Sequence, residues 1–549
     1  MKIFKNAVLG LLLSMTGFTL SAAPPTADET VKNALKAHVE FLADDTLQGR
    51  LAGSAEYEIA ARYVSSRFKQ YGLRPAGNNM GANTTDNKSW FQSVPFIKST
   101  QDSASLAMVL DTGSQQTELK SPHQFIAFSS TRAEQENVRG KLVFAGFGIV
   151  SKALKHNDYA NIDVKGKIVV FLAGRPTAFP SEEGAHVSSV GEKFRNAAER
   201  GAIGVISVHT PMFEKARPYS LFAKFAAAPT MKWQKKDGSA FAGYPALKGS
   251  VFVTVEAGKQ LFSQAGLKLE QVIEQVRNAK DPSNFDMDLT VTLKQKSQHE
   301  IIHSSNVVGV IEGSDPKLKH EYVVYSAHLD GVGVSTDGSN AVNNGALDNA
   351  VGVALLLETA RRFTQGPRPK RSIMFIALTA EERGLLGSSY FAHNPTVPIK
   401  SIVANINLDM PFMFHPFADI IAFGQQHSTM GKFLAATLAK MNLKLSPDPV
   451  PEQAAFVRSD HYSFVKQGVP AIFLTPGFTS TDPNIIAGRM VGEFLGKHYH
   501  QPSDDLSLPL DYAAGAVFSE VNYAIGRDIA NSSERPRWHD GDFFGELFK

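Results

Sequence analysis

Hydrophobic positions near the start of the chain recur with the spacing of a helix. Between residues 30 and 73 they form two stripes in which apolar side chains return every three or four positions. The stripes comprise Val31, Leu35, His38, Phe41 and Leu42, then Ile59, Ala60, Tyr63, Val64 and Phe68. Gly72 follows the second stripe, as a glycine commonly follows a helix. We therefore expect two amphipathic helices here.

The pattern changes after residue 79 to short runs of β-branched and aromatic residues separated by Gly, Asp and Ser, which is typical of strands. These runs cover residues 106–110, 141–147, 167–172, 204–208 and 251–255. Residues 193–200, followed by Gly201, are the clearest helix among them. The stretch to residue 298 is therefore predicted to be β-rich with few helices.

From residue 306 onward, apolar runs of strand length alternate with amphipathic stretches such as 351–363 and 430–441. The apolar runs cover residues 307–311, 322–326, 373–378, 402–408 and 471–474. Runs without alternation are typical of strands buried on both faces. The order predicts an α/β fold, a mainly parallel mixed sheet flanked by helices.

The first 23 residues have the features of a secretory signal peptide. Lys2 and Lys5 precede an apolar run over residues 7–20, which is too short to span a bilayer comfortably, and Ser-Ala-Ala ends the segment. We expect cleavage after Ala23 and export to the periplasm or the medium. No later run approaches about 18 apolar residues, so we expect a soluble mature protein without a membrane anchor.

Length, charge and cysteine content limit the number of domains, the kinds of partner and the types of metal ligand that this chain can have. A chain of 549 residues is long enough for two or more domains. Removing Lys2 and Lys5 from the 56 basic residues leaves 54 against 53 acidic ones, and a net charge of +1 gives no case for nucleic-acid binding. Cysteine is absent, so any metal must be held by histidine and carboxylates. These patterns do not specify the oligomeric state.

Five potential metal ligands stand at positions that allow them to converge. Three of them, His328, Glu382 and Asp409, directly follow predicted strands. Asp348 precedes the helix predicted at 351–363, and His500 lies in a loop near the end of the chain. Ligands of open α/β sheets bind outside the carboxyl ends of the strands. We therefore expect these side chains to meet at one edge of the sheet, although each alone is weak evidence.

The chemistry of this set fits two zinc ions. Two divalent ions about 3.5–4 Å apart need a bridging carboxylate and further ligands for each ion. Two histidines and three carboxylates provide them, as zinc permits. Glu381, beside Glu382, could stay free to take a proton from water at the metals. Asp330 could reach back to orient the imidazole of His328 as a supporting carboxylate.

Six strings around these residues closely resemble the zinc aminopeptidases of the di-zinc exopeptidase group, which includes bacterial leucyl aminopeptidases and glutamate carboxypeptidase-like enzymes. The strings are YSAHLDGVG, NGALDNAVGVALLLETA, FIALTAEERGLLGSSYF, NINLDM, RSDHYSFVKQGVPAIF and YHQPSDD. The early stretch from FLADDTLQGRLAGS to YGLRPAG resembles the segment that precedes the catalytic part in this group. The resemblance implies a zinc exopeptidase fold.

The resemblance also implies a role for each residue. Asp348 would bridge two zinc ions per chain, His328 with Asp409 would complete one ligand set, and Glu382 with His500 the other. Glu381 would be the general base. His461, within RSDHYSF, falls where such enzymes often place a side chain that supports the tetrahedral intermediate, although a packed or supporting histidine explains it nearly as well.

The middle of the chain resembles a protease-associated (PA) domain. The matching strings are VRGKLVFAGFG, DYANIDVKGKIVVFLAG and KFRNAAERGAIGVISV. We therefore predict a signal peptide at 1–23, a helical start of the peptidase domain at 24–90, a β-rich insert containing the PA domain at 91–298, and the zinc peptidase domain at 299–549. The insert would either shape substrate access or be passive.

The function expected from the resemblance is a secreted aminopeptidase that acts on the N-termini of peptides or proteins. Three alternatives keep the fold: a carboxypeptidase with the same ligands, a glutaminyl cyclase with a single zinc, and a catalytically inactive binding protein. The complete ligand set argues against the last two. The serine-hydrolase motif Gly-x-Ser-x-Gly does not occur in the sequence.

Overall fold

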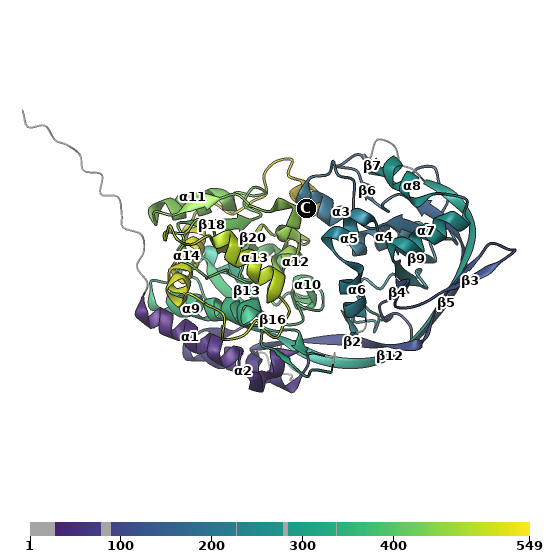
Figure 1. Cartoon of the computed structure of the whole chain (residues 1–549). Coiled ribbons are helices and arrows are strands. Elements are labelled where there is room, and N and C mark those ends of the chain that lie inside the picture. The colour runs from purple at the N-terminus through teal and green to yellow at the C-terminus, as the bar shows by residue number, and fades with distance from the viewer. Residues whose placement is uncertain (1–27, 78–88, 227, 278–283, 336–337) are drawn as a thin grey trace, which may run out of the picture.

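One sixteen-stranded sheet runs through both lobes of the chain (Figure 1). The computed structural model describes residues 28–77, 89–226, 228–277, 284–335 and 338–549, so the predicted signal peptide lies outside the described residues. We call residues 112–277 the middle lobe. The larger lobe consists of residues 28–77 and 306–549. Strands β2 (Phe91–Asp111) and β12 (Asn284–Ile311) belong to both lobes.

The larger lobe has the predicted α/β architecture. Its central strands β13 (Tyr322–His328), β16 (Ser372–Leu378), β17 (Ile402–Asn407) and β20 (Ala471–Pro476) are parallel. The end of β12 and β18 (Asp419–Phe423) run antiparallel to their neighbours. Every residue of β16 and β17 is buried, because helices cover both faces of the sheet.

Helices α1 (Glu29–Leu42), α2 (Ala55–Gln70), α9 (Val351–Gln365) and α14 (Tyr512–Asn531) cover one face, and α10 (Leu386–His393) and α12 (His461–Val465) the other. The remaining elements of this lobe are β1 (Arg74–Pro75), β14 (Gly333–Val334), β15 (Val342–Asn343), β19 (Lys444–Ser446), α11 (Met430–Lys440), α13 (Ala487–Lys497) and α15 (Phe543–Leu547). No helix in the described ranges is long and apolar enough to cross a membrane.

The two N-terminal helices form where the sequence pattern predicts them, but their buried faces differ from the predicted stripes. Phe41 is 38% exposed and Ile59 is 49% exposed. Val39, which the stripes omit, is buried instead, since with Leu35 and Leu42 it follows the 3.6-residue period more closely. Those two members of the predicted stripes were therefore wrong.

The middle lobe is built on parallel strands β5 (Gln135–Ala145), β8 (Ile168–Leu172), β9 (Gly204–Val208) and β11 (Ser250–Val253). It holds more helices than predicted, because parallel strands need crossover connections. They are α3 (Ser181–Val187), α4 (Val190–Glu199), α5 (Pro211–Ala216), α6 (Tyr219–Ala226), α7 (Val255–Gln264) and α8 (Leu269–Val276). The short strands are β3 (Gln116–Leu119), β4 (Phe125–Ile126), β6 (Val150–Ser151), β7 (His156–Asn157) and β10 (Thr230–Trp233).

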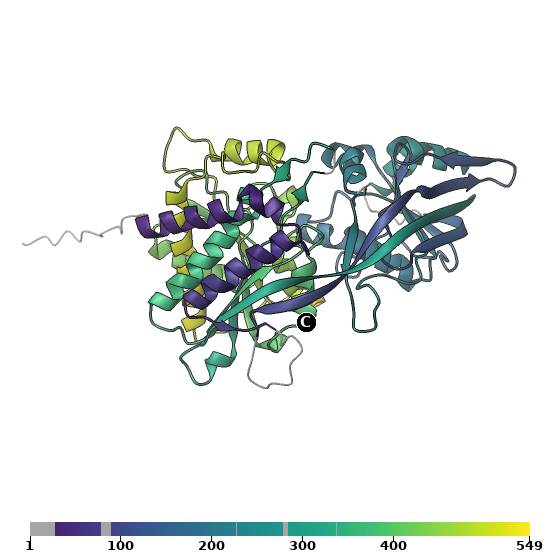
Figure 2. The same ribbon diagram turned by 90° about the horizontal axis from the view of Figure 1, so that it is seen from below.

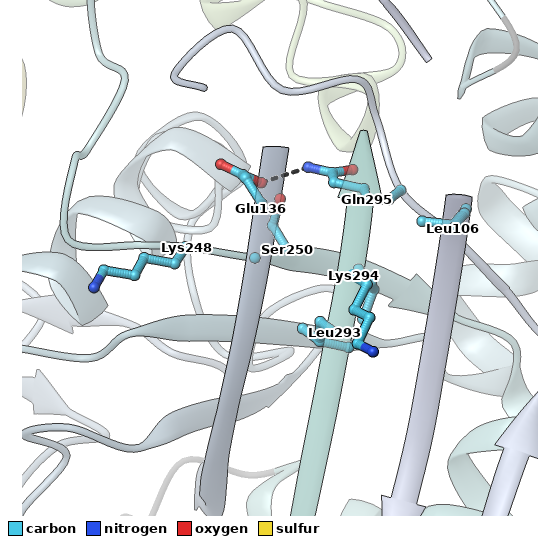
Figure 3. Close-up of a pocket in the computed structure, with 10 residues that line it drawn as sticks. Leu106, Glu136, Lys248, Ser250, Leu293, Lys294 and Gln295 are labelled. Atoms are coloured by element: carbon cyan, nitrogen blue, oxygen red, sulfur yellow. Dashed lines mark hydrogen bonds between the residues drawn. The ribbon is translucent and has the colours of Figure 1, made fainter. Parts of the chain in front are cut away.

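A cavity of about 10 Å³ beside β5 and β12 is the size of a single water molecule (Figure 3). Beside it, the amide of Gln295 donates to the carboxylate of Glu136 at 2.5 Å. This cavity therefore has no room for a substrate.

A long two-stranded ribbon joins the lobes (Figure 2). β2 and β12 pair antiparallel from Phe91↔Val307 to Asp111↔Thr290, and β12 continues the sheet to β16 in the larger lobe and to β5 in the middle lobe. The sequence pattern indicated only the ends of these strands, at 106–110 and 307–311. Residue 298, the predicted boundary, falls inside β12, so the lobes share strands.

Candidate metal centre

The predicted ligands lie at the carboxyl ends of three neighbouring strands. His328 is the last residue of β13, Asp409 follows the end of β17, and Glu381 and Glu382 lie in the turn after β16. β13 pairs with both β16 and β17 in parallel, so the three strand ends meet. Asp348 lies in a turn at Ala346–Ala350, directly before α9.

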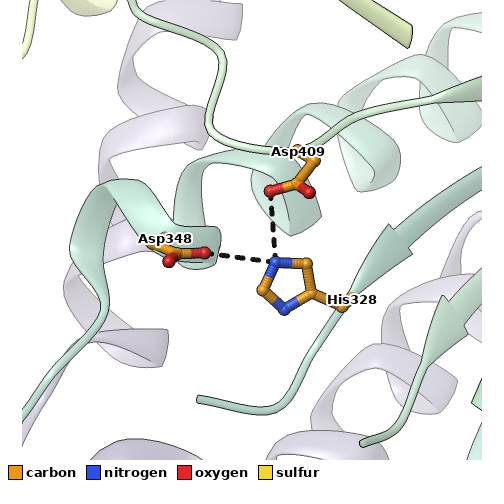
Figure 4. A group of neighbouring side chains, drawn as sticks. All are labelled: His328, Asp348 and Asp409. Carbon is orange, nitrogen blue, oxygen red and sulfur yellow. Dashed lines mark hydrogen bonds and ion pairs between the residues drawn. The ribbon is translucent and has the colours of Figure 1, made fainter. Parts of the chain in front are cut away.

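His328, Asp348 and Asp409 form a buried cluster (Figure 4). Nε2 of His328 lies 3.2 Å from Oδ1 of Asp348 and 3.2 Å from Oδ1 of Asp409. A single ring N–H can point at only one of these two oxygens. Two carboxylates and one imidazole nitrogen that converge in this way are suited to share a cation.

A second cluster shares Asp348 with the first. Oδ2 of Asp348 lies 3.3 Å from Nε2 of His500, which in turn lies 3.0 Å from Oε2 of Glu382. Asp348 therefore presents one oxygen to each imidazole, which is the arrangement of a bridging carboxylate. Glu381 and Glu382 also approach His328, and the ligand atoms of each such group lie within 4.8 Å of one another.

The backbone orients the imidazole of His328. Its Nδ1 lies 3.1 Å from the carbonyl oxygen of Asp330, so Nδ1–H donates there and Nε2 faces the cluster. The carboxylate of Asp330 instead accepts from the backbone N–H groups of Glu381 and Glu382, at 3.0 and 3.3 Å. The expectation that this carboxylate contacts His328 was therefore wrong, because it is used to fix the neighbouring turn.

Charge accumulates in this centre. Burial alone would lower the pKa of His328, but the carboxylates of Asp409 and Glu381 hold this pKa well above its usual range. Burial raises the pKa of Glu381 well above its usual range, and Glu382 adds to this shift. Three carboxylates, with Glu381 beside them, face only two imidazoles. The chemistry of this donor set fits a pair of divalent cations, with all ligands drawn from nitrogen and oxygen.

Two buried residues that the sequence reasoning did not assign hold Asp348 in place. Asp504 accepts from the backbone N–H groups of Leu347 and Asp348 at 2.8 and 3.0 Å. The amide of Asn349 donates to the carbonyl of Leu408 at 3.0 Å and accepts from the N–H of Met410 at 3.2 Å. Asn349 therefore ties the turn that carries Asp348 to the segment that carries Asp409. Their strings, GALDNA and YHQPSDD, were the available signal.

Arg50 lies beneath the centre and was also not assigned. Its side chain is 1% exposed and donates to the carbonyls of Leu42, Leu329, Asn344 and Gly345. Although burial lowers its pKa, the carboxylates of Asp504, Asp330, Asp348 and Glu382 act in the opposite direction. Arg50 thus joins the N-terminal segment to the site and offsets part of its negative charge.

His461 lies apart from the ligand clusters. It is fully buried in α12, and the rings of Phe456 and Phe473 lie 5.3 and 5.6 Å from its own. Burial lowers its pKa to about 4, so the ring is neutral. This position favours the packed interpretation, and a catalytic role for His461 stays a prediction.

Sequence comparisons point to the same part of the chain. Peptidase family M28 matches residues 306–525, and the PA domain matches residues 138–241. Aminopeptidase YwaD of Bacillus subtilis (strain 168) is 28% identical over 287 residues, covering 52% of this chain and 46% of that protein. Leupeptin-inactivating enzyme 1 of Streptomyces exfoliatus is 26% identical over 284 residues, covering 50% and 58%. The chain thus spans about half the length of these curated relatives.

The fold matches that of a solved structure, an aminopeptidase from Aneurinibacillus sp. strain AM-1, with a TM-score of 0.50 and 20% identity. The match covers 92% of this chain and 94% of that one, so it includes both lobes. Residues 306–525 of the larger lobe thus match peptidase family M28, and residues 138–241 of the middle lobe match the PA domain.

Proposed function

We propose that this protein is a zinc-dependent aminopeptidase that releases N-terminal residues from peptides. The observation that carries the proposal is Asp348, whose two oxygens face the imidazoles of His328 and His500, each beside a further carboxylate. The name of the Bacillus subtilis relative, an aminopeptidase, supports this choice of exopeptidase.

Two zinc ions would be held by the two clusters. His328, Asp348 and Asp409 would bind one ion, and Asp348, Glu382 and His500 the other. When bound, such ions supply Lewis-acid chemistry: they polarise a carbonyl group and make water more acidic. Asp330 and Asp504 hold the turns that carry these ligands through backbone N–H groups.

Glu381 would move the proton. Its carboxylate is half-buried beside the ligands, where it can take a proton from the attacking water and deliver it to the leaving amine. Near divalent cations it should be ionised before the reaction, because opposite charges lower the pKa of a carboxyl group. Burial acts in the opposite direction and raises the pKa of Glu381, which strengthens this carboxylate as an acceptor of the water proton.

A peptide panel tests this function. We would assay peptides with free or acetylated N-termini and free or amidated C-termini, with and without a chelator, and count zinc per chain. Release from free N-termini only, lost on chelation and with two zinc ions, is expected. Release that requires a free C-terminus would make the enzyme a carboxypeptidase. One zinc with ring formation from N-terminal glutamine would make it a cyclase.

We also propose that the mature chain is exported after cleavage at Ala23. The support is the leader composition described above. Mass spectrometry of the N-terminus from a cell fractionation would test it, and an intact N-terminus in the cytoplasmic fraction would contradict it.

A further inference from the structure

Helix α3 of the middle lobe docks on the larger lobe beside the C-terminus (Figure 1). The carboxylate of Glu182 lies 2.7 Å from Nε2 of His427 and accepts from the amide of Gln426 at 2.6 Å. Nδ1 of His427 lies 2.6 Å from the carboxylate of Asp542. These contacts fix the start of α3 against residues far away in sequence.

Further along α3, His186 is buried among rings of the larger lobe. Its Nδ1 lies 2.5 Å from the hydroxyl of Tyr462. The ring centroids of Phe543, Phe544 and Phe548 lie 6.0, 6.2 and 5.5 Å from the centroid of the His186 ring. Burial lowers the pKa of His186 to about 4, so the ring is neutral at neutral pH, and its tautomer sets whether Nδ1 or the Tyr462 hydroxyl is the donor.

The turn that receives α3 also supports a proposed metal ligand. The backbone N–H of Tyr462 donates to the carbonyl of Ser459 at 3.0 Å. The hydroxyl of Ser459 donates to Oδ2 of Asp409 at 2.5 Å, which leaves Oδ1 facing His328. Three hydrogen bonds in series therefore connect the middle lobe to Asp409.

We propose that His186 is a positioning residue: through Tyr462 and Ser459 it holds Asp409 in the orientation that binds the ion shared with His328 and Asp348. The inference rests on the proposed metal centre. It makes the middle lobe a fixed support of the site, because α3 touches the turn that holds a ligand.

We expect loss of the His186 contact to lower the affinity for one of the two zinc ions. Loss of a group that directly supports a ligand typically costs about 10–100-fold in metal affinity. Because His186 acts through two further residues, we expect a smaller loss, of about three- to tenfold, and only at the ion held by Asp409. The ion held by Glu382 and His500 should bind as in the wild type.

Two conservative variants test the link. His186→Phe and Tyr462→Phe keep the aromatic packing and remove the contact between imidazole and hydroxyl. Zinc would be titrated into the metal-free proteins in competition with a chromogenic chelator, and kcat and KM measured on the same preparations. Glu183→Gln, on the same helix, is the matched control. The double variant should lose no more affinity than either single variant, since all three break one contact.

Clear results would overturn the inference. Wild-type zinc affinity at both sites in both variants would do so, even if their melting temperatures fall, because that is the signature of a purely structural contact. Losses that add up in the double variant would show that the two residues act separately. A wild-type protein that binds no zinc would instead refute the metal centre itself, before any variant is made.

Discussion

Two buried histidines, His328 and His427, each lie between two carboxylates, yet the arrangements differ. At the proposed metal centre, one nitrogen of His328 faces both Asp348 and Asp409, at 3.2 Å each, while the other is hydrogen-bonded to a backbone carbonyl. At the lobe interface, Nε2 of His427 faces Glu182 at 2.7 Å and Nδ1 faces Asp542 at 2.6 Å.

The difference shows how a ligand can be told from an ion pair. At His427 each carboxylate faces its own ring nitrogen. The imidazole is a cation, and its two N–H groups each donate a hydrogen bond to one carboxylate. At His328 two acceptors compete for one nitrogen, so a proton satisfies only one of them. The convergence on one nitrogen, rather than the count of neighbouring acids, indicates a metal site.

The largest effect should be on turnover, which depends on a carboxylate at the proposed metal centre but far less on one at the lobe interface. Glu381→Gln removes the proposed base, and we expect turnover to fall by about 10²–10⁴-fold while zinc stays bound. Glu182→Gln makes the same change at the interface and should lower turnover far less, because it touches no reacting group. Steady-state kinetics with zinc analysis checks both. Near-wild-type turnover in Glu381→Gln would refute the base assignment.

Zinc removal should affect only one of the two histidine sites. Free zinc at 100 times the Kd of a site stabilises the folded protein by about 2.7 kcal/mol. We expect a chelator to lower the Tm of wild type and of His427→Gln by the same amount, and that of His500→Ala by less. Calorimetry with and without chelator measures this. A reduced shift in His427→Gln would mean that His427 also binds metal.

The smallest effect concerns pH. Glu182 and Asp542 raise the pKa of His427 to about 9, against the burial that would lower it, while the unfolded value is about 6.5. A raised pKa stabilises the folded state fully below pH 6.5, and the contribution is lost as pH rises through 9. The Tm advantage of wild type over His427→Gln should therefore shrink between pH 6.5 and 9. A constant difference would mean that His427 is not charged.

The convergence of the proposed metal ligands could be predicted because these residues stand next to regular elements. The strands that precede His328 and Asp409 are continuous apolar runs, and the ends of parallel strands meet by topology alone. Arg50 could not be found this way. Its four carbonyl partners become neighbours only once the N-terminal segment folds against β13 and the loop before α9.

The ribbon between the lobes was missed for a different reason. Long parts of β2 and β12 are not apolar runs: burial alternates along residues 284–300, where Lys, Gln and Ser face outward or pair with polar neighbours. Such a strand is recognised only together with its partner, and the partner is about 200 residues away in sequence, as in Ile97↔Ile301. Local pattern therefore identified only its two apolar ends.

That ribbon sets how the insert can be removed. Ile97 and Ile301 are direct antiparallel partners, and such partners can be joined by a two-residue hairpin turn. A shortened chain that joins Ile97 to Ile301 through such a turn would lack the residues between them, including the whole PA region. Every strand that precedes a proposed ligand would stay intact. The truncated chain would keep its six proposed chemical groups and lose α3, and with α3 the proposed support of Asp409.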